Sequence, residues 1–260
     1  MIPKGLPLSV NPPESGLERL SGTFGKEAVS SSERRALVTG LFDKISPRYD
    51  LMNDLMSFGL HRLWKRKVIQ ETIRQAHALP GTLVDLAGGT GDIAIGIRKV
   101  LPDREIVIVD ASAGMLHVAA KRSNRSIQLV HAPGEAIPLE SASASAVTLV
   151  FGLRNMTDPR LALTECARLL KPGGRLMLLE FSKAKSWFKP FYATHSNFVI
   201  PALGALIARD KRAYAYLVES IRLFPGKDDI SVELESAGLK VISVQSFMFG
   251  VAAFHIAEKS

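Results

Sequence analysis

Residues Thr82 to Asp92 have the types and spacing of a nucleotide-binding turn. Here an apolar run is followed by three glycines and then by an apolar helical pattern, Thr-Leu-Val-Asp-Leu-Ala-Gly-Gly-Thr-Gly-Asp. This order indicates a strand, a tight turn and a helix. Glycines suit such a turn because they adopt positive φ angles and let a ligand approach the backbone closely. The free N–H groups that begin the helix would point at that ligand.

Two cofactor classes are compatible with the glycines. Gly89-x-Gly91-x-x-Ala94 fits a dinucleotide fingerprint, so a nicotinamide enzyme is one alternative. Asp85 favours the other, because a carboxylate would repel a pyrophosphate but attract the amine and sulfonium of S-adenosylmethionine. Asp110 ends the next expected strand and is placed to hold ribose hydroxyls in either case. The structural alternatives are a turn-capping carboxylate for Asp85 and a strand-end or N-cap residue for Asp110.

Composition predicts one globular α/β domain with embellishments. The chain has 260 residues, of which 47% are hydrophobic. Its single cysteine, Cys166, excludes an internal disulfide and a cysteine-based metal cage, and we expect no metal. A formal net charge of +8 favours an anionic partner. Since few aromatic residues alternate with the basic ones, we expect a membrane surface and no nucleic acid.

The first 78 residues divide into a tail and a helical pair. Residues 1–35 are rich in proline, glycine and serine without a hydrophobic period, so we expect a mobile or loosely docked tail. Within 36–78, Pro47 can begin one helix and Gly59 can end it, and a second helix would run from Leu60 past Ile73. Polar residues around this pair favour a lid over the cofactor, whereas its apolar positions suit ordinary packing.

From Thr82 onward, strands alternate with helices. We expect strands at 82–86, 105–110, 127–131, 146–151 and 174–180, separated by helices at 92–100, 114–122 and 158–170. A helix from Asp228 and two strands at 239–247 and 251–257 would end the chain. Apolar strands spaced in this way predict a largely parallel sheet that binds ligands at the carboxyl ends of its strands. The residues that follow the strands are therefore candidates: Gly89, Thr90, Gly91, Asp110, Pro133, Gly134, Val150, Phe151, Gly152, Arg154 and Asn155.

Three signatures carry a resemblance to a known family. They are Tyr49-Asp-x-Met-Asn53 followed by Ser57, His61 and Trp64; Phe151-Gly-Leu-Arg154-Asn155-Met-Thr-Asp158; and Arg168-Leu-Leu-Lys-Pro-Gly-Gly-Arg-Leu-Met-Leu-Leu-Glu180-Phe-Ser182. From about Phe42 to near its C-terminus the chain resembles the ubiquinone/menaquinone C-methyltransferase (UbiE/MenG) family. The resemblance implies the Rossmann-like, seven-stranded, mostly parallel sheet of a class I methyltransferase over residues 36–260. It also implies an N-terminal helical lid and a helical substrate-lid insertion at 183–225, before the last two strands.

The resemblance implies S-adenosylmethionine-dependent C-methylation of a polyprenyl hydroquinone, a benzoquinol or demethylmenaquinol, in ubiquinone/menaquinone biosynthesis. Together with the loop residues, it gives this expected cofactor-binding set: Asp85, Gly89, Thr90, Gly91, Asp110, Gly134 and Val150. The chain departs from the family pattern where it has Pro133-Gly134 for Asn-Ala, Val150 for Ser, Ala144-Ser145 for an aromatic-Asp pair and Phe198 for His. Pro133 has no N–H to donate, although Gly134 retains one.

Methylation of a ring carbon requires that carbon to be electron-rich, which deprotonation of a neighbouring hydroxyl achieves. Arg154 is expected to stabilise the phenolate or to position a water molecule that takes the proton. Asn155 and Tyr49 are expected to hold the other hydroxyl, and the resemblance points to the same positions. The alternative for Arg154 is a loop salt bridge with Asp158. Two conventional bases are expected to be structural: His61 and His195.

The stretch after Glu180 predicts contact with a membrane. Lysines and aromatic residues at 183–192 precede a short apolar run at 198–208, which is too short to span a bilayer. Aromatic residues beside cations suit a membrane interface, while a lid helix that packs on the domain is the alternative. We expect a cytoplasmic protein peripheral to the inner face of a bacterial membrane, rather than one of the mitochondrial matrix. A homodimer and a quinone-biosynthesis complex stay open as partners.

Two other functions are compatible with parts of the sequence. An NAD-dependent reductase would use the glycine loop, but Asp85 and the lack of a Tyr-x-x-x-Lys pair count against it. A non-catalytic, cofactor-binding member of a quinone-biosynthesis assembly would explain the departures at Pro133, Val150 and Phe198. Methyl transfer to a demethylated quinol separates the enzyme from both.

Overall fold

A computed structural model describes residues 16–24, 27–46, 53, 54, 57, 59–194 and 211–260. Its main feature is a seven-stranded sheet in the order β5-β4-β3-β6-β7-β9-β8. The strands are β3 (Thr82–Leu86), β4 (Ile106–Asp110), β5 (Gln128–His131), β6 (Ala144–Val150), β7 (Leu170–Phe181), β8 (Leu239–Phe247) and β9 (Ala252–Lys259). The first five pair in parallel, and β9 runs antiparallel to both β7 and β8. The mostly parallel sheet expected from the sequence is confirmed.

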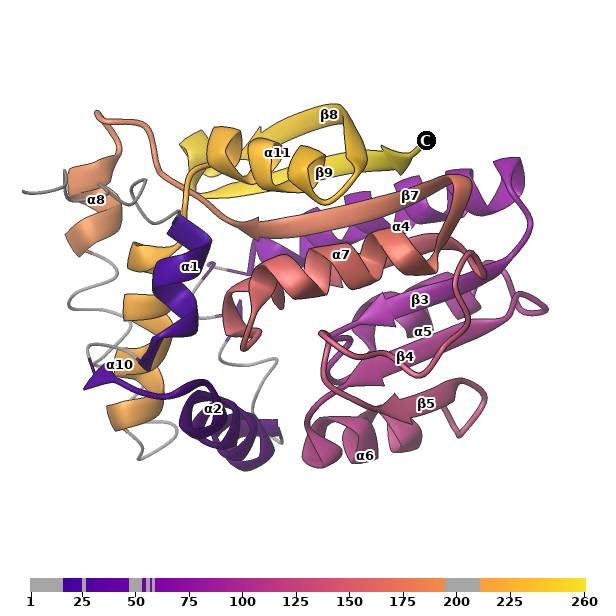
Figure 1. Cartoon of the computed structure of the whole chain (residues 1–260), viewed down its shortest axis with the longest axis horizontal. Helices are drawn as coiled ribbons and strands as arrows, with labels where there is room; N and C mark the ends of the chain where they lie inside the picture. Colours follow the sequence, from indigo (N-terminus) through magenta and orange to yellow (C-terminus); the bar gives the residue numbers. More distant parts are fainter. Residues whose placement is uncertain (1–15, 25–26, 47–52, 55–56, 58, 195–210) are drawn as a thin grey trace, which may run out of the picture.

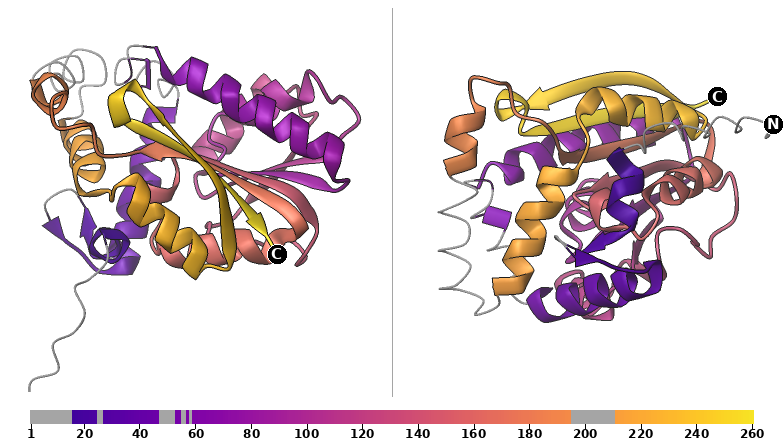
Figure 2. Two further views of the ribbon diagram at one scale, coloured as in Figure 1. Left: turned by 90° about the horizontal axis from the view of Figure 1, so that it is seen from above. Right: turned by 60° about the vertical axis from the view of Figure 1, so that its left-hand side comes forward.

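Helices cover both faces of this sheet, which explains why its central strands are apolar on both sides. On one face lie α4 (His61–Ala78), α5 (Asp92–Arg98) and α6 (Ala113–Arg122), and on the other lie α7 (Pro159–Leu169) and α11 (Lys227–Ser236) (Figures 1 and 2). The strand β6 is buried throughout. Its Val147 and Leu149 belong to the core cluster under α7, whereas Ala146 and Val150 belong to the cluster under α4. Successive side chains of β6 point to opposite faces of the sheet, so this strand contributes to both hydrophobic cores.

The start of β7 differs from the sequence prediction. The strand begins at Leu170 rather than at 174, directly after α7. Leu170 pairs with Ala144, and the register then shifts before Arg175 pairs with Ala146. This irregularity accommodates Pro172 and the two glycines, residue types that normally interrupt a ladder.

Additional helices gather beyond the carboxyl ends of the parallel strands. They are α1 (Gly16–Ser21), α2 (Ser31–Ile45), α8 (Lys189–Thr194) and α10 (Lys211–Leu223), and Figure 1 shows them together at that edge. Two short strands, β1 (Thr23–Phe24) and β2 (Glu27–Ala28), form a hairpin between α1 and α2. The predicted insertion at 183–225 therefore contains α8 and α10. The expected helix between Pro47 and Gly59 lies largely outside the described residues.

Residues 16–24 and 27–35 were expected to belong to a mobile or loosely docked tail, but they form regular elements that pack on the domain. Leu17 and Leu20 of α1 are buried to 1% exposure in the core under α7. Helix α2 begins at a capping box, in which Ser30 and Glu33 satisfy each other's backbone N–H groups. Two leucines three residues apart are too few to produce a visible period, yet their burial is enough to dock one short helix.

Candidate active site

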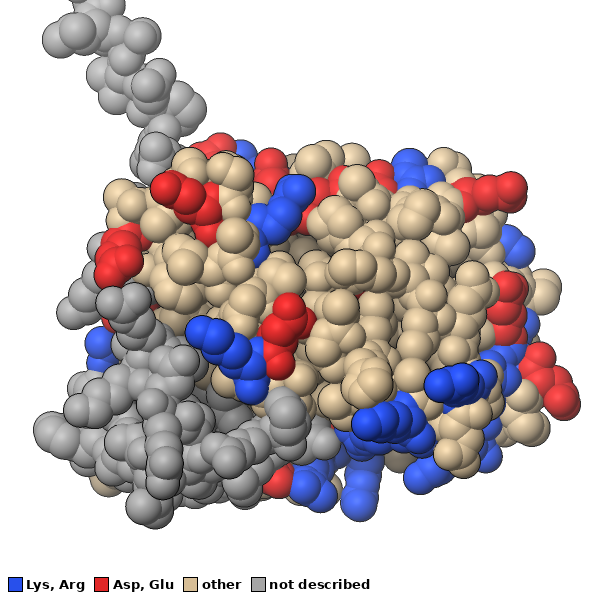
Figure 3. Space-filling view, turned by 90° about the horizontal axis from the view of Figure 1, so that it is seen from below, with Lys and Arg blue, Asp and Glu red and all other residues tan. Residues whose placement is uncertain are grey.

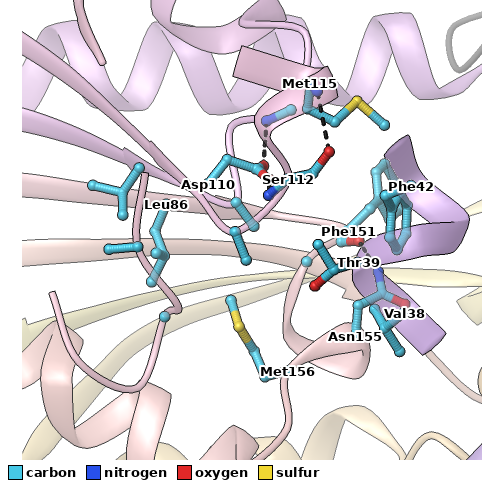
Figure 4. Close-up of a pocket in the computed structure, with 17 residues that line it drawn as sticks. Val38, Thr39, Phe42, Leu86, Asp110, Ser112, Met115, Phe151, Asn155 and Met156 are labelled. Atoms are coloured by element: carbon cyan, nitrogen blue, oxygen red, sulfur yellow. Dashed lines mark hydrogen bonds between the residues drawn. The ribbon is translucent and has the colours of Figure 1, made fainter. Parts of the chain in front are cut away.

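Two adjoining pockets open at the carboxyl edge of the sheet and share Ala87 and Gly89. The first pocket, shown in Figure 4, is lined by Val38, Thr39, Phe42, Leu86, Ala87, Gly89, Val109, Asp110, Ala111, Ser112, Met115, Ala132, Gly134, Phe151, Gly152, Asn155 and Met156. The second pocket is lined by Lys65, Asp85, Ala87, Gly88, Gly89, Thr90, Asp92, Ile93 and Val150. Most of the site residues predicted from the sequence thus line one or the other of two neighbouring chambers.

Asp110 joins two loops in the first pocket. Its Oδ2 accepts a hydrogen bond from the Gly89 N–H at 2.9 Å, and its Oδ1 accepts one from the Ser112 N–H at 2.8 Å (Figure 4). Burial raises the pKa of this carboxyl above its usual value, while the two N–H donors oppose that rise. Each carboxylate oxygen can accept a further bond, so Asp110 can hold a ligand's hydroxyls while it fixes the glycine loop.

Asp85 lies in the second pocket and is 2% exposed. Its Oδ1 accepts from the Thr148 hydroxyl at 2.7 Å, and its Oδ2 accepts from the Ala94 N–H at 3.2 Å. The capping role considered for Asp85 is therefore present, and the same carboxyl also lines a chamber. Burial raises the pKa of Asp85 to about 6 in spite of these two donors. The carboxylate is under-stabilised by the protein alone, which suits a site for a positive ligand group.

The backbone at this edge adopts unfavourable conformations. Ala87 follows β3 with φ 51°, and Phe151 follows β6 with φ 56°, although neither is glycine. Both residues line the first pocket. At Gly88 an added Cβ would lie 2.9 Å from the Asp85 Oδ2 atom, so a side chain there would displace the carboxylate. Such outliers persist where the surrounding structure enforces them, commonly at functional sites.

Helix α2 forms a wall of the first pocket that the sequence did not predict. Val38, Thr39 and Phe42 line the chamber (Figure 4), and the next residue, Asp43, secures the helix. The Asp43 carboxylate accepts from the Ser112 hydroxyl at 2.5 Å and from the Gly114 N–H at 3.0 Å. These bonds tie α2 to the first turn of α6. No sequence signal distinguishes such wall residues from ordinary core positions.

The prediction that Arg154 faces the cofactor is wrong. Its side chain is 2% exposed and is not among the residues that line either pocket. Its Nη1 donates to the Glu180 Oε1 atom and to the Phe151 carbonyl, both at 2.7 Å. The salt bridge considered with Asp158 is also wrong, because Asp158 accepts from the Leu161 N–H as the N-cap of α7.

Asn155 lies in the first pocket as expected, and its orientation is fixed from two sides. Its Nδ2 donates to the Phe151 carbonyl at 3.2 Å, and the Tyr216 hydroxyl donates to its Oδ1 at 3.1 Å. Tyr216, on α10, is buried and stacks on Phe24 with ring centroids 4.5 Å apart. Tyr216 is a site residue that sequence reasoning missed, since 61 positions separate it from Asn155.

Of the other site residues predicted from the sequence, some line a pocket and some do not. Gly134 lines the first pocket, where an added Cβ would lie 2.7 Å from the Met156 Sδ atom. Thr90 and Val150 line the second pocket. Gly91 instead supplies the left-handed N-cap of α5, with φ 83°. Tyr49, His195 and Phe198 lie outside the described residues.

Comparison with known proteins identifies the family. A model of the ubiE/COQ5 methyltransferase family matches residues 28–259. The chain belongs to this family. The enzyme named ubiquinone/menaquinone biosynthesis C-methyltransferase UbiE in Rubrivivax gelatinosus is 42% identical, with 93% of this chain and 94% of the relative covered. A relative of the same name in Hahella chejuensis is 38% identical, with 94% and 99% covered.

Solved structures agree on the fold of this methyltransferase. A SAM-dependent methyltransferase from Thermotoga maritima superposes with a TM-score of 0.57 at 18% identity, covering 86% of this chain and 100% of the other. A methyltransferase bound to the Trm112 activator of Haloferax volcanii also gives 0.57, at 14% identity, covering 84% of this chain and 96% of the other. The class I methyltransferase fold is confirmed, and the methyl donor is S-adenosylmethionine.

The polar and apolar groups of the two pockets fit S-adenosylmethionine. The half-buried Asp110 offers acceptors for ribose hydroxyls, and apolar neighbours such as Leu86 and Met156 suit a flat base. The under-stabilised Asp85 offers a negative charge to the donor's amine. The two pockets therefore offer one carboxylate to the ribose hydroxyls and another to the amine of the methyl donor.

Other groups in the methyltransferase are structural. His61 is buried beside the Ser57 hydroxyl, with 2.9 Å between Nδ1 and Oγ, and burial lowers its pKa to about 4. Cys166 is fully buried, and burial raises the pKa of its thiol to about 12.

Among the residues that the structure describes, no group of three or more potential ligands could hold a metal ion. No helix within the same ranges is long and apolar enough to cross a membrane.

Proposed function

We propose that this methyltransferase transfers the methyl group of S-adenosylmethionine to a ring carbon of a polyprenyl hydroquinone, a benzoquinol or a demethylmenaquinol. The relatives that support this proposal are named for ubiquinone/menaquinone biosynthesis. The observation that carries it is the first pocket, in which the cofactor-type carboxylate of Asp110 and the oriented amide of Asn155 share one apolar-walled chamber. A hydroquinone offers an apolar ring and two hydroxyls, which such a chamber can bind.

Each residue has a proposed role in binding the donor. Asp110 accepts from the ribose hydroxyls, and Gly134 leaves room for the base. Asp85 pairs with the donor's amine, while Thr90 and Val150 line the chamber around it. Gly89 and Gly91 let the loop approach the ligand and aim the N-terminus of α5 at it. When bound, S-adenosylmethionine supplies an electrophilic methyl group on its sulfonium.

The acceptor is proposed to bind through Asn155. One Asn155 N–H and one Oδ1 lone pair stay available beyond the bonds to the Phe151 carbonyl and the Tyr216 hydroxyl, so the amide can hold a ring hydroxyl. We propose Tyr49 for the other hydroxyl. Arg154 acts as a positioning residue in this account, because its guanidinium ties the Phe151 carbonyl to Glu180 and so fixes the segment that carries Asn155.

Calorimetry of cofactor binding tests the donor site. Because a positive amine favours the charged carboxylate, binding should lower the pKa of Asp85, which is about 6 in the free protein. At pH 6 we expect Asp85 to release about half a proton per molecule on binding, and at pH 7 only about a tenth. Affinity should correspondingly rise with pH through 6, level off near neutral pH, and fall again at about pH 8, where the donor's own α-amino group loses its proton. The released proton is measured from the dependence of the binding enthalpy on buffer ionisation enthalpy.

The matched control for this titration is Asp85→Asn, which keeps the shape of the side chain but cannot ionise. This variant should bind S-adenosylmethionine more weakly and release no proton at pH 6. Tight binding of NADH with none of S-adenosylmethionine would contradict the proposed donor. Proton release that persists in Asp85→Asn would assign the titration to another group.

We also propose that the methyltransferase works in peripheral contact with the inner, anionic face of a bacterial membrane, where a polyprenyl acceptor resides. Two features support this contact. The formal net charge is +8, and Lys and Arg side chains gather along one side of the face shown in Figure 3. Anionic lipid attracts such a surface.

A further inference from the structure

Four aromatic side chains form a cluster on the outside of the molecule. Trp187, Phe188 and Phe191 come from the segment after β7, and Phe249 comes from the turn between β8 and β9. The Phe249 ring lies 4.7 Å from that of Trp187 and 5.0 Å from that of Phe188, centroid to centroid, and the Phe188 ring lies 6.2 Å from that of Phe191. We call these four residues the aromatic cap.

The aromatic cap is exposed in a way that ordinary packing does not explain. Trp187, Phe191 and Phe249 are 58%, 69% and 51% exposed. Phe188 is partly buried and packs against the core cluster under α4. The cap is therefore anchored by one ring and presents three others to the surroundings. A contiguous group of exposed large apolar side chains marks an interaction surface.

Backbone contacts hold the two segments of the aromatic cap together. Met248 and Phe249 have φ angles of 45° and 55°, which bulky residues rarely adopt. The Lys185 N–H donates to the Phe249 carbonyl at 2.9 Å, and this bond joins the two segments of the cap. At Gly250, with φ 94°, an added Cβ would lie 2.9 Å from the Lys183 carbonyl oxygen. The close approach of the segments thus depends on a glycine, and the unfavourable turn points to a function for Phe249.

Lysine side chains lie around the aromatic cap. Lys183, Lys185 and Lys189 are exposed beside it. Between Phe181 and Arg209 the sequence contains no aspartate or glutamate. Burial and the neighbouring Lys189 lower the pKa of Lys183, whereas the nearby Asp229 opposes this shift. A surface with exposed tryptophan and phenylalanine among lysines complements anionic lipid headgroups above an apolar layer.

The position of the aromatic cap connects it with the first pocket. Its first segment continues from the carboxyl end of β7, the edge at which the pockets open, and Figure 1 shows α8 beyond that edge. The Phe181 ring at the end of β7 lies 4.9 Å from the ring of Phe151, which lines the first pocket. A membrane bound at the cap would lie at the edge that carries the active site.

We propose that Trp187, Phe191 and Phe249, anchored by Phe188, insert into the interface of an anionic bilayer, with Lys185 and Lys189 against the lipid phosphates. The inference rests on the proposed function only in so far as a lipid-soluble acceptor gives the contact a purpose. Lys183 contributes less, because its Nζ donates to the Arg222 carbonyl. The occupant of this surface is thus a lipid layer rather than a protein.

Vesicle binding of the full chain tests the proposal. Phosphatidylcholine vesicles that contain phosphatidylglycerol should bind the protein at least about tenfold more tightly than pure phosphatidylcholine vesicles, and added salt should weaken this difference. Trp187→Ala with Phe249→Ala should reduce the partition coefficient by tenfold or more, on the order of the loss of two buried aromatic groups. Lys185→Gln and Lys189→Gln should each reduce it by roughly fivefold on anionic vesicles.

Fluorescence provides a local readout. The chain has two tryptophans, and Trp64 is buried at 5% exposure, so a lipid-dependent blue shift should arise from Trp187. Trp187→Phe should keep the binding and lose the shift. Val232→Ala is the matched control, since Val232 is 61% exposed on α11, away from the cap, and should change neither result.

Three outcomes would overturn the proposal: unchanged vesicle binding in Trp187→Ala with Phe249→Ala, no blue shift on anionic vesicles, or concentration-dependent self-association that this double variant abolishes. The last outcome would assign the cap to a second copy of the chain. Methyl transfer to a short-tailed, water-soluble quinol is measured on the same variants. Retained methyl transfer alongside lost vesicle binding in the double variant is the expected result. If the parent protein binds vesicles through the cap but methylates no quinol, the proposed function fails and this inference stands; if it methylates the quinol but the double variant still binds vesicles, only this inference fails.

Discussion

Replacing Arg154 with alanine is expected to lower the free energy of unfolding by about 3–5 kcal/mol. The substitution removes the ion pair with Glu180 and leaves that carboxylate buried at 2% exposure without its cation. Burial already raises the pKa of Glu180, and the Arg154 charge is the main influence that opposes the rise. Urea denaturation followed by circular dichroism measures the loss.

A double variant separates the ion pair from any direct action on the substrate. Arg154→Met with Glu180→Gln removes both charges, so most of the lost stability should return. If Arg154 acts only by positioning, the double variant should keep its turnover within about tenfold of the parent. A folded double variant whose kcat is lower by three or more orders of magnitude would contradict this positioning role. It would indicate that Arg154 stabilises the phenolate of the substrate directly. A single variant as stable as the parent would show that the pair contributes nothing.

Replacing Asp110 with alanine is expected to raise the Kd for S-adenosylmethionine by about 100-fold or more. The change removes the carboxylate that holds the Gly89 and Ser112 N–H groups, and with it the proposed contact to the ribose. Hydrogen bonds to a charged group contribute about 1.5–3 kcal/mol each, so the loss of one or two accounts for this factor. Calorimetric titration of the folded variant measures it.

The controls for Asp110 vary charge and position separately. Asp110→Asn keeps one acceptor oxygen and should weaken binding by an intermediate factor. Asp103→Ala removes an exposed carboxylate from the loop before β4 and should leave the Kd unchanged. Unchanged affinity in Asp110→Ala would exclude Asp110 from the cofactor site.

Sequence patterns predicted the sheet and part of the site for a physical reason. The alternation of strands and helices determines which strands end at one edge, so Asp85, Asp110 and Asn155 could be expected close together. All three line the two pockets. The glycine loop could be predicted because its chemistry is local, although Gly91 caps α5 rather than lining a chamber.

Contacts between distant segments could not be predicted in this way. The Arg154–Glu180 pair depends on the register between β6 and β7, and the Tyr216–Asn155 bond depends on where α10 docks. Arg34 of α2 donates to the Arg154 carbonyl at 2.9 Å, a contact that spans 120 positions. Periodicity and spacing describe neighbours within an element, but they do not determine the docking of one element on another.

A labelled methyl donor shows directly whether the methyl group is transferred to carbon. The methyltransferase is supplied with S-adenosylmethionine that carries a carbon-13 methyl group and with a demethylated quinol kept reduced, and the product is examined by mass spectrometry and carbon NMR. We expect a label in a methyl group attached to a ring carbon, formed only when protein and donor are both present. A label on oxygen, or no labelled product from either a benzoquinol or a naphthoquinol acceptor, would contradict it.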